Sequence, residues 1–385
     1  MCLFLALCFT GFGAFAPFFP LYMQELGVTD RAQAASLAGT ASGVTLVLFA
    51  VANVVSGAVA DRWGLRASLV RATVMFGIGL AIVALATAPP VAVFGRVTQG
   101  LAGGWSGIVL AYAAAIVPTA HLGSALGLVQ TAQSVGNSVG PLIGGFAGDV
   151  IGFRLSFYIG GIIMALLSVA MMVFLREPPR TTRNSFSLGQ GLRYVGSSRE
   201  ILGVMLLTVV LNAGYQAQWL LLTIGIQEIA PNPAEVGRWS GVAFLADAAG
   251  IASAAALFGR VAKRAPTYRV IALAAIGVLM AMLGHLVVRD VLLFAALRLV
   301  VGLCMGTAWP AIRLRLVEVS DPSRRALVFG VNQGMFSLSL AVGAFVGSAV
   351  IGVGGFTGVT AVGGVLVILA AALAWRGHRA ATGAP

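Results

Sequence analysis

Long apolar runs, separated by short polar loops, extend from the first residues of the chain to its last. About 20 consecutive apolar residues are needed to cross the hydrocarbon core of a bilayer as a helix. Runs of this length recur throughout, with glycine, proline or arginine at the breaks. The pattern predicts an all-α membrane protein with twelve transmembrane helices. The predicted spans are residues 1–22, 36–59, 68–88, 91–117, 122–147, 155–175, 201–227, 236–258, 269–288, 291–316, 325–351 and 357–376.

Composition places the chain in the same class. Its 385 residues are 59% hydrophobic and only 9% charged, with a mean hydropathy of +0.97. A soluble domain carries about 25% charged residues, so the sequence leaves no room for one. The 50 glycines also fit a membrane protein, because small residues let transmembrane helices approach closely.

The net charge of +12 would suit nucleic acid, but its distribution excludes that partner. Most of the 24 basic residues fall in short loops on one side of the predicted spans. The loops on the other side carry Arg31, Arg154, Arg238 and Arg289. Cytoplasmic loops of membrane proteins are enriched in arginine and lysine. The sequence therefore predicts that both termini are cytoplasmic and that the basic loops lie against the bilayer.

One longer polar stretch, residues 176–200, divides the chain. It predicts two six-helix halves, residues 1–175 and 201–385, joined by a cytoplasmic linker. The halves resemble each other at an offset of about 202 residues, as expected for the parallel repeats of some transporter folds. At this offset Arg96 and Gly100 match Arg298 and Gly302.

Residues 57–69 form the most specific motif and read Gly-Ala-Val-Ala-Asp-Arg-Trp-Gly-Leu-Arg-Ala-Ser-Leu between two apolar runs. They resemble the loop between helices 2 and 3 of the major facilitator superfamily, which implies a secondary transporter. In that family the acid faces the N-terminus of helix 11 and latches the two halves together on the inside. The alternative is that the arginines only set the topology. The predicted gating residues are Gly57, Asp61, Arg62, Gly64, Arg66, Arg324 and Arg325.

A second motif lies in the fifth predicted span, where residues 136–145 read Gly-Asn-Ser-Val-Gly-Pro-Leu-Ile-Gly-Gly. It resembles the pattern of exporters in the superfamily, especially drug–proton antiporters. Glycines at a spacing of four share one helix face and form a flat packing surface, and a proline permits a bend. Simple helix packing is the alternative interpretation. The motif residues are Gly136, Gly140, Pro141, Gly144 and Gly145.

Three charged residues lie well inside predicted spans, away from the span ends: Asp247, Arg96 and Arg298. An arginine there costs about 2.5–3.5 kcal/mol on insertion scales, so such residues mark functional sites. Arg96 and Gly100 also resemble a family motif proposed for proton transfer, and the three residues are the proton-coupling candidates. The alternatives are arginines that reach the headgroups and a static salt bridge between Asp247 and Arg298. Asp149 and the other acids at the outer helix ends are expected to be solvated.

The resemblance further implies that helices 1, 4, 7 and 10 line a central cavity. Aromatic residues and a few polar groups there favour apolar or amphipathic cargo, since a sugar carrier needs more hydrogen-bonding groups. Packing or lipid contact is the alternative for any single aromatic. The cavity candidates are Phe12, Phe15, Gln99, Trp105, Tyr112, Tyr215, Gln216, Trp219, Trp309 and Gln333.

Together these features predict a monomeric, proton-coupled exporter of the bacterial cytoplasmic membrane. Its partners are small-molecule cargo, protons and the lipid bilayer. The sequence has no phosphate loop, no metal-binding pattern and no enzyme signature, so no cofactor is expected. Three alternatives stay open: a dedicated exporter of a siderophore, antibiotic or metabolite, an uptake symporter, and a transport-inactive receptor or scaffold.

Overall fold

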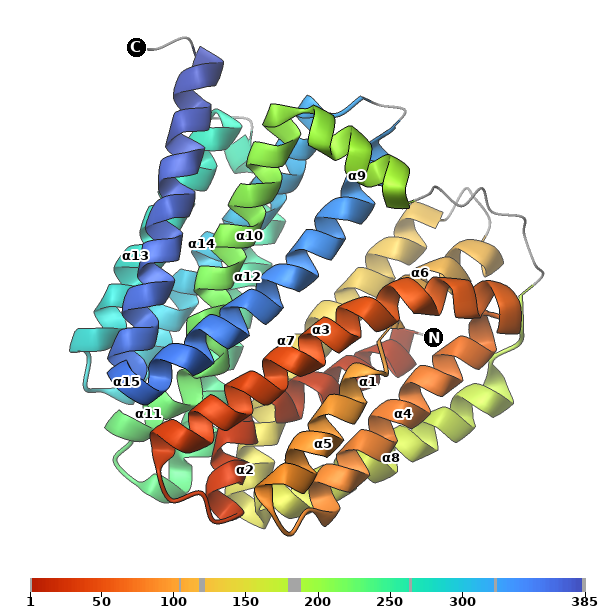
Figure 1. Ribbon diagram of the computed structural model, residues 1–385, viewed down its shortest axis with the longest axis vertical. Coiled ribbons are helices and arrows are strands. Elements are labelled where there is room, and N and C mark those ends of the chain that lie inside the picture. Colours follow the sequence, from red (N-terminus) through yellow and green to blue (C-terminus); the bar gives the residue numbers. More distant parts are fainter. Residues whose placement is uncertain are drawn as a thin grey trace. The chain divides into compact units, whose positions relative to one another are not determined.

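The computed structural model describes residues 2–103, 105–117, 122–178, 188–262, 265–321 and 324–382. In these residues every regular element is a helix (Figure 1). The helices form two compact units. Unit 1 comprises Met1–Arg183 and Pro231–Gly241, and unit 2 comprises Asn184–Ala230 and Val242–Pro385.

Unit 1 holds the first eight α-helices, and Figure 1 shows α4 and α8 side by side within it. The first turn of α12 also belongs to this unit. Its elements are α1 (Cys2–Phe15), η1 (Ala16–Phe18), α2 (Phe19–Glu25), α3 (Arg31–Trp63), α4 (Leu65–Leu85), α5 (Pro89–Gly100), α6 (Trp105–Ile116), α7 (Leu122–Ile151), α8 (Phe153–Phe174) and η3 (Pro233–Glu235).

Unit 2 holds the remaining helices, and α10 packs along α15 within it (Figure 1). A short helix, α9, forms inside the stretch that the sequence predicted to be a polar linker. The elements are α9 (Leu188–Ser197), α10 (Arg199–Leu220), α11 (Leu222–Ile229), α12 (Val236–Ala262), α13 (Thr267–Val287), α14 (Val291–Val319) and α15 (Arg325–Thr382).

The predicted spans coincide with these helices. Each span falls on one helix or on consecutive helices of the described part. Nine helical segments of that part are long and apolar enough to cross a membrane. The last of them, Val328–Arg379, contains both final predicted spans. It bends at Gly355, where φ is +58°, a conformation that glycine adopts without a steric penalty.

Short polar groups fix several helix starts. The Asp30 carboxylate accepts a hydrogen bond from the Ala32 N–H at the start of α3, and Asp290 does the same for Leu293 at the start of α14. Side-chain caps of this kind satisfy N–H groups that have no partner within the helix.

Glycines lie where helices pack most closely, and equivalent glycines make equivalent contacts in the two units. On α7, a Cβ at Gly140 would lie 2.6 Å from the carbonyl oxygen of Thr10 on α1. On α15, a Cβ at Gly343 would lie 2.5 Å from the carbonyl oxygen of Ala213 on α10. The two contacts are related by one sequence offset. Helices at the first and fifth positions of each predicted half therefore pack backbone to backbone, as the internal repeat requires.

The outer surface is apolar along the helices. Phe174, Val287 and Val353 are 74%, 79% and 95% exposed. A soluble protein rarely exposes large contiguous apolar patches, whereas a bilayer solvates them. The fold is that of an all-α, multi-pass membrane protein.

Candidate functional site: a buried charged cluster in unit 2

Unit 2 encloses an ion pair in its apolar interior. The Arg298 guanidinium on α14 lies 3.0 Å from the Asp247 carboxylate on α12, and the two side chains are 0% and 2% exposed. The Tyr215 hydroxyl on α10 donates a hydrogen bond to the other carboxylate oxygen. Arg298 also lies over the Tyr215 ring, 5.4 Å from its centroid. Two of the three proton-coupling candidates and one cavity candidate thus form a single cluster.

Two further polar side chains complete this cluster. Arg298 donates a hydrogen bond to the Gln218 side-chain oxygen at 3.2 Å. The Gln218 amide nitrogen in turn donates to the Thr360 hydroxyl on α15 at 3.0 Å. We call Asp247, Arg298, Tyr215, Gln218 and Thr360 the Asp247 cluster. It links four helices of unit 2 through side chains alone.

Glycines allow α12 and α14, the helices that carry Asp247 and Arg298, to pack closely beside the ion pair. A Cβ at Gly302 on α14 would lie 2.0 Å from the Asp247 carbonyl oxygen, and a Cβ at Gly250 on α12 would lie 2.4 Å from the Leu299 carbonyl oxygen. The backbones of α12 and α14 are therefore in contact beside the ion pair. This approach allows two side chains of very different length to meet at 3.0 Å.

A second group of polar side chains lies on the same helix as Tyr215. The Trp309 indole N–H donates to the Asn212 side-chain oxygen at 2.8 Å. The Trp309 ring meets the Tyr215 ring edge to face, with centroids 6.0 Å apart. One turn away, the Thr208 hydroxyl donates to Asn332 at 3.3 Å. The polar side chains of α10 therefore extend beyond the Asp247 cluster: Asn212 contacts Trp309, and Thr208 contacts Asn332.

The other cavity candidates of unit 2 do not share one environment. Trp219 packs against Phe244 with ring centroids 4.9 Å apart and also lies beside the Asp247 side chain. Gln216 is buried, whereas Gln333 is exposed on α15. The structure therefore brings Tyr215 and Trp309 together, and it leaves Gln333 outside this group.

In unit 1, Arg96 is buried without an acid. It is 3% exposed, it donates to the Gln99 side chain, and it lies over the Phe19 ring at 5.7 Å. No ion pair to Arg96 occurs among the described residues. The repeat explains the difference, because the residue equivalent to Asp247 in the first half is Thr45, whose hydroxyl donates to the Arg96 carbonyl oxygen. The acid is present in the second half alone.

The loop motif has one partner that the sequence did not identify. The Glu177 carboxylate accepts hydrogen bonds from the backbone N–H groups of Leu65 at 2.6 Å and Arg66 at 2.9 Å, and so caps α4. Gly64 precedes them with φ of +98°. A Cβ at Gly64 would lie 2.5 Å from Glu177 Oε1. The position therefore requires glycine for two reasons, its positive φ and the close approach of Glu177. The Arg66 guanidinium donates to the Met172 carbonyl oxygen of α8.

The other residues that the sequence predicts to form the gate do not lie together with Glu177. Arg62 is exposed near the end of α3. Arg324 lies over the ring of Tyr194 on α9, 4.7 Å from its centroid. The side chains of Gly57, Asp61 and Arg325 lie outside the described residues, so the inner latch stays a prediction.

The glycine motif of residues 136–145 forms two packing surfaces on α7. Cβ atoms at Gly136 and Gly144 would lie 2.5 Å and 1.9 Å from carbonyl oxygens of α1. Pro141 lies on the same side, 3.3 Å from the Cβ position of Gly13. Gly145 faces elsewhere, since its Cβ would lie 2.1 Å from the carbonyl oxygen of Gly237 in the first turn of α12.

Asp149, at the end of α7, corrects one expectation. The sequence placed it among the solvated outer acids. Instead the half-buried carboxylate accepts hydrogen bonds from the N–H groups of Gly237 at 2.9 Å and Arg238 at 2.5 Å. It thereby caps α12, where unpaired N–H groups and the helix dipole favour a negative charge. A neighbour about 90 residues away in the sequence could not be identified from local pattern.

The cavity candidates of unit 1 do not form a single group as Tyr215 and Trp309 do in unit 2. Phe15 packs against Phe157 with centroids 4.9 Å apart. It also lines an apolar pocket of about 200 Å³ between α1, α7 and α8. The Tyr112 hydroxyl donates to the Arg176 carbonyl oxygen at 2.7 Å, toward the linker end of the unit. The side chains of Phe12 and Trp105 lie outside the described residues.

Sequence reasoning missed Gln218 and Thr360 as members of the Asp247 cluster, and Glu177 as the cap of α4. The sequence could have indicated Gln218 as a site residue, because a glutamine inside an apolar span needs a polar partner. No comparable signal marked Thr360, since threonine satisfies itself within helices by bonding a preceding carbonyl group.

The Asp247 cluster connects the charge of Asp247 to side chains on two other helices, α10 and α14. A buried charge is stable only with its partner, and removal of one partner leaves the other uncompensated. Protonation of Asp247 removes its negative charge and so releases Arg298 to other partners. The carboxylate also accepts a hydrogen bond from Tyr215, and the Tyr215 ring contacts the Trp309 ring. A change in the charge of Asp247 would therefore act on groups from α10, α12 and α14.

The chain is similar to known proteins in sequence and in fold. The chain is 26% identical over 379 residues to the multidrug resistance protein MdtG of Escherichia coli (strain K12 / DH10B), with 97% of this chain and 92% of that protein covered. Its fold is similar to a bacterial homologue of the human lysosomal transporter Spinster (TM-score 0.79, 15% identity, 98% and 95% of the two chains covered). It is also similar to the D-xylose-proton symporter (TM-score 0.74, 16% identity, 97% and 96% covered).

The family model of the Major Facilitator Superfamily matches residues 1–288 and 204–383, and so spans nearly the whole sequence. The members of this superfamily are membrane transporters and not enzymes. This chain belongs to the Major Facilitator Superfamily.

Proposed function

We propose that this transporter is a proton-driven exporter of small apolar or amphipathic molecules, a multidrug efflux antiporter. The observation that carries the proposal is the Asp247 cluster. Asp247 is the one acid that the sequence places deep within a span, and it is buried against Arg298 and Tyr215. Buried ionisable groups inside membrane proteins mark ion pathways and proton relays.

Two observations support export and the cargo class. The glycine surface of α7 follows the pattern that the sequence resemblance associates with exporters. The likeness to a multidrug resistance protein extends over 97% of the chain. Tyr215 within the cluster is aromatic, and so are Trp219 and Trp309 beside it, which suits flat apolar cargo. We accordingly propose the bacterial cytoplasmic membrane as the location, with both termini inside, and a monomer built of two six-helix halves.

The test uses inside-out membrane vesicles that contain the protein and a lipophilic fluorescent dye. We expect an imposed proton gradient, acid inside, to drive dye into the vesicles, and an uncoupler to abolish the uptake. ATP without a proton gradient should have no effect. Asp247→Asn should abolish uphill transport while dye binding persists. Asp290→Asn is the matched control, because Asp290 is an exposed helix cap and asparagine caps about as well as aspartate.

Full proton-driven transport by Asp247→Asn would refute the role of this acid. Proton-driven movement of a cargo in the opposite direction would establish an uptake symporter and overturn the export assignment. Cargo-dependent proton flux with a cell-derived metabolite extract but with none of the dyes would replace multidrug export by dedicated export.

A further inference from the structure

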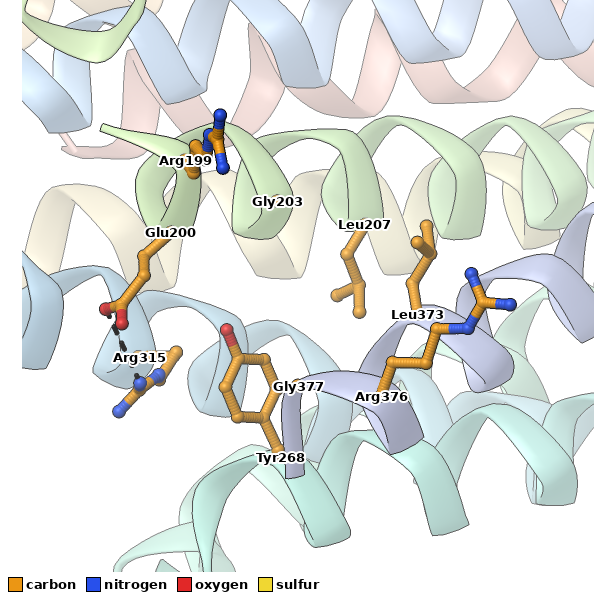
Figure 2. A pocket seen from close by; sticks show the side chains of 9 residues that line it. All are labelled: Arg199, Glu200, Gly203, Leu207, Tyr268, Arg315, Leu373, Arg376 and Gly377. Carbon is orange, nitrogen blue, oxygen red and sulfur yellow. Dashed lines mark ion pairs between the residues drawn. The ribbon is translucent and has the colours of Figure 1, made fainter. Parts of the chain in front are cut away.

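A second pocket in unit 2 has a different chemistry from the Asp247 cluster. It measures about 350 Å³ and lies between the ends of four helices, α10, α13, α14 and α15 (Figure 2). Small-ligand pockets in proteins measure about 300–1,000 Å³. The lining residues are Arg199, Glu200, Gly203, Leu207, Tyr268, Arg315, Leu373, Arg376 and Gly377.

The charge of this pocket is positive and only partly compensated. Arg315 is held by Glu318 at 2.8 Å and by Glu200 at 3.8 Å, and its guanidinium lies 4.7 Å from the centroid of the Tyr268 ring. Figure 2 shows the Glu200–Arg315 pair on one side of Tyr268 and Arg376 on the other. Among the described residues, Arg199 and Arg376 form neither an ion pair nor a hydrogen bond. Two arginines are therefore available for an anion.

The walls of the pocket are apolar next to these charges. Leu207 from α10 and Leu373 from α15 lie near each other in Figure 2. Leu207 is about two helical turns from Arg199, and Leu373 is about one turn before Arg376. A ligand that fits both parts needs a compact negative group and an adjoining apolar portion. A free inorganic anion would use the arginines alone.

The position of the pocket matches a membrane surface. The four helix ends that form it all lie on the side where the sequence places the basic loops. Trp375, next to Arg376, is 41% exposed, and tryptophan is enriched at the level of lipid headgroups. Basic pockets between transmembrane helices on the cytoplasmic side can bind lipid head groups.

From this we infer that the pocket binds the phosphate group of an anionic phospholipid of the inner leaflet. Arg199 and Arg376 contact the phosphate, for which the guanidinium fork is suited. Tyr268, held by Arg315, forms the floor, and Leu207 and Leu373 contact the first carbons of the acyl chains. The site is separate from the cargo and from the coupling proton, so it stands whether or not the proposed export does.

The test is native mass spectrometry of the full-length, delipidated protein titrated with phosphatidylglycerol. Phosphatidylcholine with the same acyl chains and inorganic phosphate are the comparison ligands. We expect phosphatidylglycerol to bind more tightly than phosphatidylcholine and to resist competition by inorganic phosphate. The double variant Arg199→Gln/Arg376→Gln should weaken binding of phosphatidylglycerol about 25-fold, since each basic residue near an anionic surface contributes about 1 kcal/mol, or about fivefold.

The charge-matched control is Arg193→Gln/Arg269→Gln, which removes two exposed arginines that do not line the pocket. Its binding should change less than twofold. Gly203→Leu fills the pocket without a clash, because no atom lies within 4 Å of its Cβ position, and it should weaken binding as well. Gly196→Leu on α9 is the control for this variant, since its Cβ position is equally open.

Three results would overturn the inference. An equal loss in the two arginine pairs would show a general effect of surface charge. Displacement of phosphatidylglycerol by millimolar inorganic phosphate would identify a free-phosphate site. Equal binding of phosphatidylglycerol and phosphatidylcholine would remove the requirement for an anionic lipid. Unchanged thermal stability of each variant ensures that a loss of lipid is not a loss of fold.

Discussion

The ion pair between Asp247 and Arg298 is both a structural contact and the proposed coupling site, and a double-mutant cycle separates the two roles. The single variants Asp247→Asn and Arg298→Gln each leave one buried charge without its partner. The double variant Asp247→Asn/Arg298→Gln leaves two amides that can bond each other. We expect the double variant to recover stability but not proton coupling.

The magnitude follows from the geometry. At 3.0 Å and an effective dielectric constant of about 20, two unit charges attract each other by about 5 kcal/mol. Loss of one member of a buried pair costs about 3–5 kcal/mol, while replacement of both by neutral groups is often close to neutral. For a unit of this size that difference corresponds to a change in melting temperature on the order of 10 °C.

The assay is thermal unfolding of detergent-solubilised protein, followed by fluorescence-detected size exclusion. Proton-driven dye uptake into vesicles is measured on the same four proteins. Arg289→Gln/Asp290→Asn is the control cycle, because it changes the same charges at exposed positions. Additive losses of stability in the buried cycle would refute the ion pair. Recovery of uphill transport in the double variant would refute the role of Asp247 as proton carrier.

Three other predictions test the packing and gating surfaces. Asp61→Asn should shift the equilibrium toward the inward-facing state, seen as longer distances between spin labels on the inner loops of the two halves; an unchanged distribution would reject the latch. Gly140→Leu should slow transport about tenfold with membrane insertion intact, because overpacking costs about 1–3 kcal/mol. Gly334→Leu, whose Cβ position is open, is its control, and equal rates in the two would contradict the packing role. Glu177→Ala should destabilise the fold by about 0.5–2 kcal/mol, the usual value of a helix cap, and an unchanged melting temperature would show that the cap is dispensable.

The features that depend on local physics could be predicted from the sequence. A bilayer requires long apolar helices with satisfied backbone groups, so the spans could be read from composition along the chain. The parallel repeat could be read as well, because glycines recur at equivalent positions. The cost of a charge inside a span singled out Asp247, Arg96 and Arg298 before any contact was known.

The interaction partners of these three residues could not all be predicted from the sequence. The sequence offered a pair between Asp247 and Arg298 as one alternative, and the structure places them 3.0 Å apart. It treated Arg96 as the equivalent of Arg298, yet Arg96 has Gln99 and the Phe19 ring as neighbours. The difference arises because the position facing it holds Thr45, a comparison that needs the register between helices.

Tertiary structure alone decided where the remaining polar groups go. The sequence predicts that Asp149 is a solvated acid at a helix end, whereas in the structure it caps α12. The sequence places Glu177 in a polar linker, whereas in the structure it caps α4. A cap joins a side chain to whichever helix start lies within about 3 Å, and sequence spacing does not determine that neighbour. The chain by itself thus determined its membrane class, its repeat and its buried charges, whereas the packing of helix against helix determined which charges meet.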